Sequence, residues 1–167
     1  MVSKRLNAKG RRESGAFAPI PCAVLSHANF IKLTMKATRL LFDLCSQLNF
    51  NAGGTANNGN LTAALSIMKH RGWKSPETLS KAVSELRYYG FIIQTRPPGR
   101  NICALYAIAW WSVDDCHPDV IQTKIPSNEW KHEKPKFKYK KSLIRFFDPI
   151  NTKSVLAGNF RTGTCHD

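Results

Sequence analysis

Residues 61–100, LTAALSIMKHRGWKSPETLSKAVSELRYYGFIIQTRPPGR, carry the clearest helix and strand signals in this sequence. It predicts a helix that begins at Ser75, a good N-cap, with Pro76 preorganised for the first helical position. Apolar residues then recur at the spacing of one buried helical face, at Leu79, Ala82, Val83 and Leu86. Gly90 is suited to close this helix, and the six residues after it, FIIQTR, change to strand character.

Two more helices are expected before this one, and a hairpin after it. From Thr34, which can cap its start, a first helix has its buried face at Ala37, Leu40, Leu41, Leu44 and Leu48. Residues 49–60, NFNAGGTANNGN, are rich in Asn and Gly and predict a turn. A second helix, ended by Gly72, is predicted from Leu61, Ala64, Leu65 and Met68. Strands at 91–96 and 102–111, joined by PPGRN, form the expected hairpin.

This order of three helices and a hairpin with a basic tip resembles the winged helix-turn-helix superfamily of bacterial regulators. The phrase LSKAVSELRYYGFII, residues 79–93, is similar to a frequent regulator pattern that runs from a recognition helix into the first wing strand. NNGNL, residues 57–61, resembles a segment of winged-helix proteins from mobile elements and phage. The expected fold class is therefore α+β, mostly α, with a three-helix core followed by a β-hairpin wing.

The chain divides into four expected regions. Residues 1–15 form a flexible basic arm and 16–33 a lead-in segment, while 34–112 hold the winged helix-turn-helix domain. Residues 113–167 form a basic C-terminal extension, ordered only in part. The whole chain of 167 residues has 25 Lys and Arg against 11 Asp and Glu, a net charge of +14, which favours polyanionic partners.

Residues that would contact DNA follow from the helical wheel of the third expected helix. With Leu79 at the centre of the buried face and about 100° per residue, four residues lie opposite: Glu77, Lys81, Ser84 and Tyr88. A major groove admits one helix, and there Lys81 can donate to guanine or a phosphate and Ser84 to either, while Glu77 can accept from cytosine. A solvated surface is the alternative interpretation of this row.

Further candidates lie on both sides of this row. Lys74, Ser75 and Thr78 crowd the N-terminal end of the helix, where backbone N–H groups favour phosphate. In the wing, Arg96, Arg100 and Asn101 can reach the minor groove or its phosphates. The basic arm resembles arms that track the minor groove or phosphates in other DNA binders, through Lys4, Arg5, Lys9, Arg11 and Arg12.

The C-terminal extension contains KHEKPKFKYKK, residues 131–141, where lysines alternate with Phe137 and Tyr139. Period-two alternation puts the lysines on one face of an extended chain and the aromatic rings on the other. The pattern fits nucleic-acid backbone tracking and an edge strand blunted by lysines equally well.

We therefore predict sequence-specific binding of double-stranded DNA, in transcriptional regulation, by a homodimer on a pseudo-palindromic site. The alternatives are a replication or partition initiator of a mobile element, and a winged helix that binds protein or RNA. Salt dependence of DNA binding separates a DNA binder from a protein-interaction module.

The chain carries no motif that predicts an enzyme, a metal site or a cofactor. It lacks a P-loop, G-x-G-x-x-G and G-x-S-x-G, and the Cys-His pairs at 116–117 and 165–166 do not have zinc-ligand spacing. No apolar run is long enough to span a membrane, and Pro19 and Pro21 interrupt the short run that could mimic a secretory signal. Five scattered cysteines without a C-x-x-C pair predict free thiols and therefore a cytoplasmic protein. As a DNA binder, it is expected at the nucleoid.

Overall fold

The computed structural model describes residues 18–139 except 52–53, 101, 116, 119, 121–122 and 124. Most of the described elements are short, and α3 (Met35–Cys45) and α5 (Pro76–Tyr88) are the longest helices among them. The remaining helices are α1 (Cys22–Leu25), α2 (Ala28–Ile31), α4 (Leu65–Met68) and the 3-10 turns η1 (Lys69–Arg71) and η2 (Glu129–Lys131). The strands are β1 (Phe50–Asn51), β2 (Gly54–Thr55), β3 (Leu61–Thr62), β4 (Ile92–Arg96) and β5 (Leu105–Ile108). The coarse fold class, α+β and mostly helical, is confirmed.

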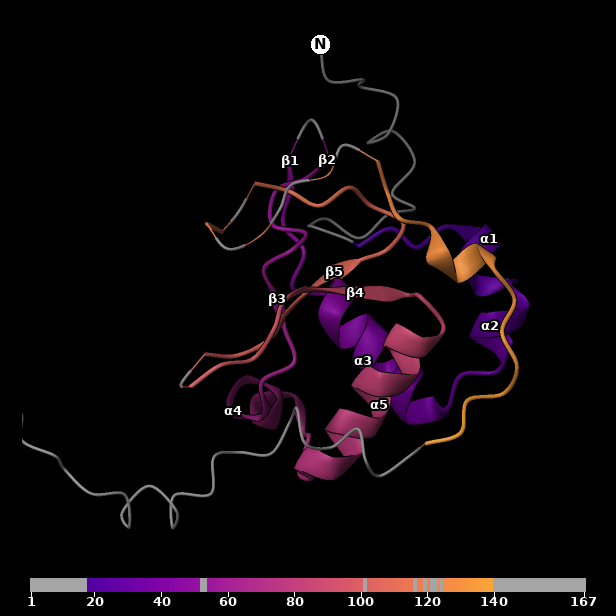
Figure 1. Cartoon of the computed structure of the whole chain (residues 1–167), viewed down its shortest axis with the longest axis horizontal. Helices are drawn as coiled ribbons and strands as arrows, with labels where there is room; N and C mark the ends of the chain where they lie inside the picture. Colours follow the sequence, from indigo (N-terminus) through magenta and orange to yellow (C-terminus); the bar gives the residue numbers. More distant parts are fainter. Residues whose placement is uncertain are drawn as a thin grey trace, which may run out of the picture.

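Helices α3 and α5 pack against each other at the centre of the molecule, as Figure 1 shows. Each begins where its cap predicts, because the Thr34 side chain accepts a hydrogen bond from the N–H of Ala37 and that of Ser75 from the N–H of Thr78. The predicted apolar faces are buried, with Leu40, Leu41, Leu44 and Leu86 at 0% exposure. Both predicted helices are therefore confirmed.

The predicted second helix starts later than expected. Leu61 lies in β3 and pairs with Tyr106 of β5, so the helical part is only α4 and η1. The apolar spacing was misleading because a buried Leu61 fits a strand as well as a helix. The Gln47 side chain pairs with the strand, donating to the carbonyl of Thr62 at 3.0 Å and accepting from its N–H at 3.0 Å. Gly72 ends the helical segment as predicted, with a left-handed φ of 82°.

The main sheet has three antiparallel strands in the order β3-β5-β4. The predicted hairpin of β4 and β5 is confirmed, with Ile92 opposite Ile108 and Gln94 opposite Tyr106, but β5 is shorter than the predicted strand. Every residue of β5 is buried because both faces are covered. Tyr106 and Ile108 belong to the main core, whereas Leu105 and Ala107 pack with Val113 and Val120.

The hydrophobic core extends beyond the expected domain of residues 34–112 at both ends. Val24, from the predicted lead-in, is 0% exposed, and Trp130, from the predicted extension, is 5% exposed. Both belong to the same cluster as the central helices. In Figure 1 the orange segment that contains η2 lies beside α1 and then runs along the outside of the helices. Residues 18–33 and 125–139 are thus part of the folded unit.

Two features are absent from the part of the chain that the structure describes. None of its helices combines the length and apolar character needed to cross a bilayer. Its His, Cys, Asp and Glu side chains form no group of three or more that could hold a metal ion. Of its cysteines, Cys22 and Cys103 are free and exposed and Cys45 is free and buried.

Candidate nucleic-acid interface

The N-terminal half of α5 presents polar and cationic groups to solvent. Lys74, Glu77 and Lys81 are exposed, whereas Ser75 and Thr78 are partly buried. The N–H of Thr78 donates to the Ser75 hydroxyl at 3.2 Å, which caps the helix. Pro76 occupies the first helical positions, as its fixed φ favours. This end of a helix also attracts anions, because its first backbone N–H groups point outward along the helix dipole.

Glu77 and Lys81 form an ion pair one turn apart on this face. The Lys81 Nζ lies 2.8 Å from the Glu77 Oε1, with the two side chains 46% and 55% exposed. The hydrogen bond to Glu77 raises the pKa of the Lys81 amine. Such an exposed pair is weak, and a phosphate can displace the carboxylate from Lys81.

The turn before α5 adds basic residues that the sequence analysis did not select. Lys69, His70 and Arg71 of η1 are all exposed. Asp43 on α3 fixes this turn, because its carboxylate accepts from the Trp73 indole at 2.7 Å and from Arg71 at 3.2 Å. The run KHR was the available signal in the sequence, since it stands only a few residues before the start of α5.

Tyr88, expected on the open row, is covered by the chain itself. Its ring lies 5.3 Å from that of Phe137, and the Lys134 Nζ lies 5.7 Å from the Tyr88 ring centroid. Nearer the middle of α5, the Lys81 Nζ lies 5.1 Å from the centroid of the Tyr139 ring. The helical wheel gave the direction of these side chains correctly, but it contains no information about a segment fifty residues further along the chain. The assignment of Tyr88 to an open DNA-facing row is therefore corrected, and Ser84 is partly buried.

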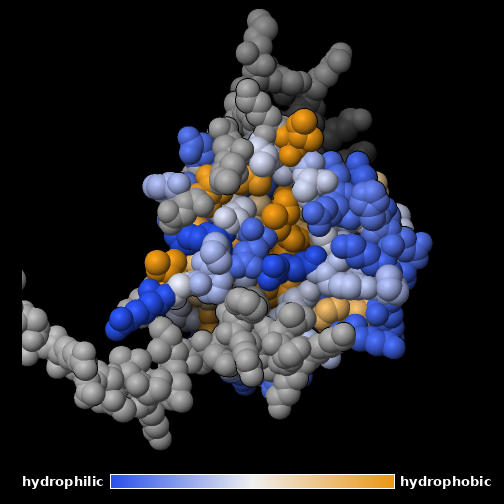
Figure 2. Space-filling model, viewed as in Figure 1, coloured by the Kyte–Doolittle hydropathy of each residue, from blue (hydrophilic) through white to orange (hydrophobic). Residues whose placement is uncertain are grey.

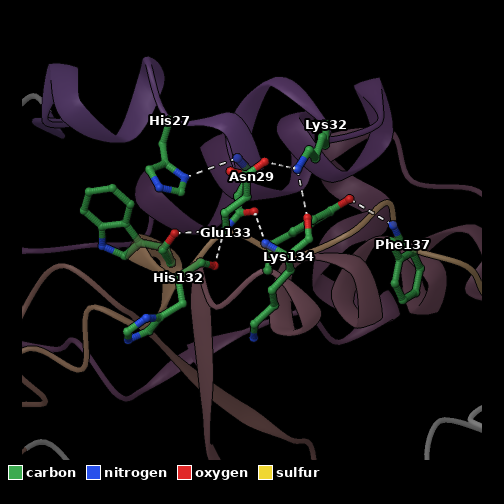
Figure 3. A network of polar contacts seen from close by, with 9 residues as sticks. His27, Asn29, Lys32, His132, Glu133, Lys134 and Phe137 are labelled. Atoms are coloured by element: carbon green, nitrogen blue, oxygen red, sulfur yellow. Dashed lines mark hydrogen bonds and ion pairs between the residues drawn. The ribbon is translucent and has the colours of Figure 1, made fainter.

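We call residues 130–139 the strap. It is held on one side by Asn29 of α2, whose side-chain amide donates to the carbonyls of Trp130 at 2.9 Å and His132 at 2.8 Å and accepts from the N–H of Lys134 at 2.9 Å. Figure 3 shows this network, with Lys32 of the neighbouring turn donating to Glu133 at 2.6 Å. These contacts fix the strap across the helices.

The strap is held on its other side by the C-terminal end of α5. The Lys134 ammonium donates to the carbonyl of Tyr88 at 2.7 Å, where a cation also complements the negative end of the helix dipole. The N–H of Phe137 donates to the Tyr89 hydroxyl at 2.9 Å. Phe137 and Tyr139 are partly buried while Lys136 and Lys138 are exposed, so the predicted alternation is present. It covers a helix, however, and the structure assigns no strand to the described part of residues 131–141.

The wing residues differ in their surroundings. Arg96 is partly buried and bonded within the hairpin, since its Nη2 donates to the Cys103 carbonyl at 3.0 Å and its Nη1 lies 2.8 Å from the His117 Nε2. Arg100 is exposed next to the bridge that pairs Gly99 with Ile102. In the space-filling view, the end of this hairpin projects from the body and is strongly hydrophilic (Figure 2).

The candidate interface thus consists of η1 and the first half of α5, with the hairpin end as a separate part. Asn101 lies outside the described residues, as does the basic arm with Lys4, Arg5, Lys9, Arg11 and Arg12. Comparison of the chain with family models, with curated proteins and with solved structures found no match.

Proposed function

We propose that this chain binds double-stranded DNA sequence-specifically as a winged helix-turn-helix protein. In this proposal, α5 enters the major groove and the β4–β5 hairpin contacts the adjacent backbone or minor groove. The observation that carries it is the exposed first half of α5 beside η1. Residues 69–81 there hold one carboxylate, Glu77, against four Lys and Arg side chains: Lys69, Arg71, Lys74 and Lys81.

The way in which α5 is covered supports this use of the helix. Recognition helices contact base edges mainly with their N-terminal residues. The strap covers Tyr88 at the C-terminal end, whereas Lys74 and Glu77 stay exposed. We assign Lys81 to a base edge, and Thr78 of the first helical turn in place of Ser84, which lies nearer the covered end of α5. Lys74 and the helix N-terminus are assigned to a phosphate.

The hairpin supports a wing role through its attachment to the same core. β5 pairs with β4 on one side and with β3, just before α4, on the other. The bonds from Arg96 to the Cys103 carbonyl link the two arms of the hairpin, whose end carries the exposed Arg100. We assign Arg100 to the DNA backbone or the minor groove, and Arg96 to the wing's structure.

We further propose that the protein acts as a transcriptional regulator at the nucleoid, without a catalytic step or a cofactor. One recognition helix reads too few base pairs to select a site in a genome, so two copies would bind a pseudo-palindrome. Selection of bound sites from random duplexes by the full chain tests this directly. We expect an enriched motif with two related half-sites; a pool that stays random would contradict sequence-specific binding.

The assignment of roles is tested with variants on the selected site and on random DNA. Thr78→Ala and Lys81→Ala are expected to cost about 1–3 kcal/mol on the selected site and much less on random DNA. Arg100→Ala is expected to weaken both about equally. Lys131→Gln, an exposed charge on η2 beside α1, serves as the control. If Thr78→Ala and Lys81→Ala weaken binding to both DNAs equally, the proposal that α5 reads bases in the major groove is wrong.

The salt dependence of binding tests the class of partner. A protein that uses the arm, α5 and the wing should neutralise about 5–8 phosphates, which gives a slope of log K against log salt of about −5 to −7 on DNA. A slope near zero would indicate a protein-interaction module. Equal affinity for a duplex RNA of the same sequence would contradict the choice of DNA.

A further inference from the structure

We propose that the strap is a second phosphate-binding element, in which Lys136 and Lys138 bind the DNA backbone beside the groove that α5 occupies. The inference rests on the proposed function and extends it to a segment outside the three helices and the hairpin. It assigns these two lysines to sequence-independent contacts, because an ammonium on a phosphate carries no base information.

The first argument is that the strap is anchored and not merely draped over the surface. The Asn29 amide makes three hydrogen bonds to its backbone, and Lys134 and Phe137 bond to the last residues of α5. Asn29 is 0% exposed, and its bond to the Trp130 carbonyl is buried and thus shielded from water. A segment held this way presents its outward side chains from a fixed backbone, which lowers the entropy lost on binding.

The second argument is the division of the strap into two faces. Phe137 packs against the main core and its ring lies 6.4 Å from that of Tyr139, while Lys136 and Lys138 point to solvent and are exposed. Within the described part of the chain, neither lysine forms a salt bridge with a carboxylate. Lys134 differs, since its ammonium is used on the carbonyl of Tyr88.

The third argument is position. The contact between Tyr139 and Lys81 places this end of the strap directly beside the exposed half of α5. A duplex whose major groove holds that half would have a phosphate ridge next to the helix, where Lys138 and then Lys136 lie. Aromatic side chains on the protein side and cations on the solvent side suit a polyanionic backbone and not an apolar partner.

The test is a salt titration of the full chain on a duplex of random sequence, followed by fluorescence anisotropy. Lys136→Gln and Lys138→Gln are each expected to reduce the magnitude of the slope of log K against log salt by about 1, and the double variant by about 2. Lys131→Gln removes the same charge at the η2 end of the strap, opposite to the end at Tyr139 that contacts Lys81, and should leave the slope unchanged. All three side chains are exposed, so the thermal unfolding midpoint should stay at its wild-type value and report an intact fold.

Each other result is decisive. If the double variant has the wild-type slope, the strap is not part of the interface, and the inference is wrong while the proposed DNA binding is unaffected. A double variant that binds DNA more tightly shows that the strap obstructs the interface, and it also overturns the inference. Wild-type protein without salt-dependent DNA binding overturns the proposed function, and the inference with it.

Discussion

Glu85 on α5 caps the start of α3 by binding Thr34. Its carboxylate accepts hydrogen bonds from the backbone N–H of Thr34 at 2.8 Å and from the Thr34 hydroxyl at 2.7 Å. Glu85 is only 4% exposed. A carboxylate at a helix N-terminus interacts favourably with the helix dipole, and shielding from water strengthens this interaction. One buried charged group therefore holds the two central helices together.

Replacing Glu85 with Ala should lower the free energy of unfolding by about 2–3 kcal/mol, because two donors lose a charged acceptor in a buried place. Urea unfolding measures this loss. Glu77→Ala, which removes a carboxylate from the exposed face of the same helix, should cause a much smaller one. Similar losses for the two variants would mean that the bonds to Thr34 contribute nothing beyond an ordinary surface charge.

Asn58 ties the turn before β3 to the end of the sheet. It is 0% exposed, and its side-chain amide donates to the carbonyls of Ile108 at 3.1 Å and Ser112 at 2.8 Å. Asn58→Asp puts a carboxylate against these two carbonyls and should cost about 3 kcal/mol or more at neutral pH. Asn60→Asp, the same change at an exposed neighbour, should cost little. Chemical denaturation of the pair would contradict this account if both changes were tolerated equally.

Gly90 and Gly72 form a matched pair for testing how closely η2 approaches the core. Both have a left-handed φ, of 76° and 82°, and either replacement by Ala should cost about 1 kcal/mol for the backbone alone. At Gly90 an added Cβ would also lie 2.8 Å from Glu129 and 2.9 Å from the N of Trp130, whereas at Gly72 it would meet the end of the Arg39 side chain at 3.0 Å. Thermal unfolding should therefore show a clearly larger loss for Gly90→Ala. Equal losses would mean that η2 moves away freely.

The pair between Lys32 and Glu133 should make the attachment of the strap sensitive to acid. The hydrogen bond and charge of Lys32 hold the pKa of the Glu133 carboxyl below 4.5. A carboxyl whose folded pKa lies below its unfolded value stabilises the fold above that unfolded value, and this contribution is lost as the pH falls through the folded pKa. NMR titration of Glu133 should give a midpoint below 4.5, and Lys32→Gln should move it upward. An unchanged midpoint in the variant would show that the pair does not form in solution.

Some residues of the candidate interface could be assigned from the sequence, and others could not. Lys74, Ser75, Thr78 and Lys81 could be assigned to one exposed helix end, because capping and helical periodicity act between residues a few positions apart. Tyr88 could not be assigned correctly, since its ring is covered by Phe137 from a segment with no periodic signal. Arg96 was expected on the hairpin's DNA side, yet its partners are Cys103 and His117. Nothing in the sequence marks which arginine of a hairpin bonds across the strands.

Local signals in the sequence were sufficient to predict α3, α5, the end of the second helix at Gly72 and the hairpin, and composition gave the large positive charge. Each of these depends on local spacing, caps, turn residues or composition, which act within a few residues or in sum. Tertiary contacts place Leu61 in a strand, put Val24 and Trp130 in the core, and lay the strap against Tyr88 of α5. These outcomes depend on contacts such as that between Asn29 and Lys134, which lie 105 positions apart. Such contacts form only when the chain folds, so they leave no local signal in the sequence.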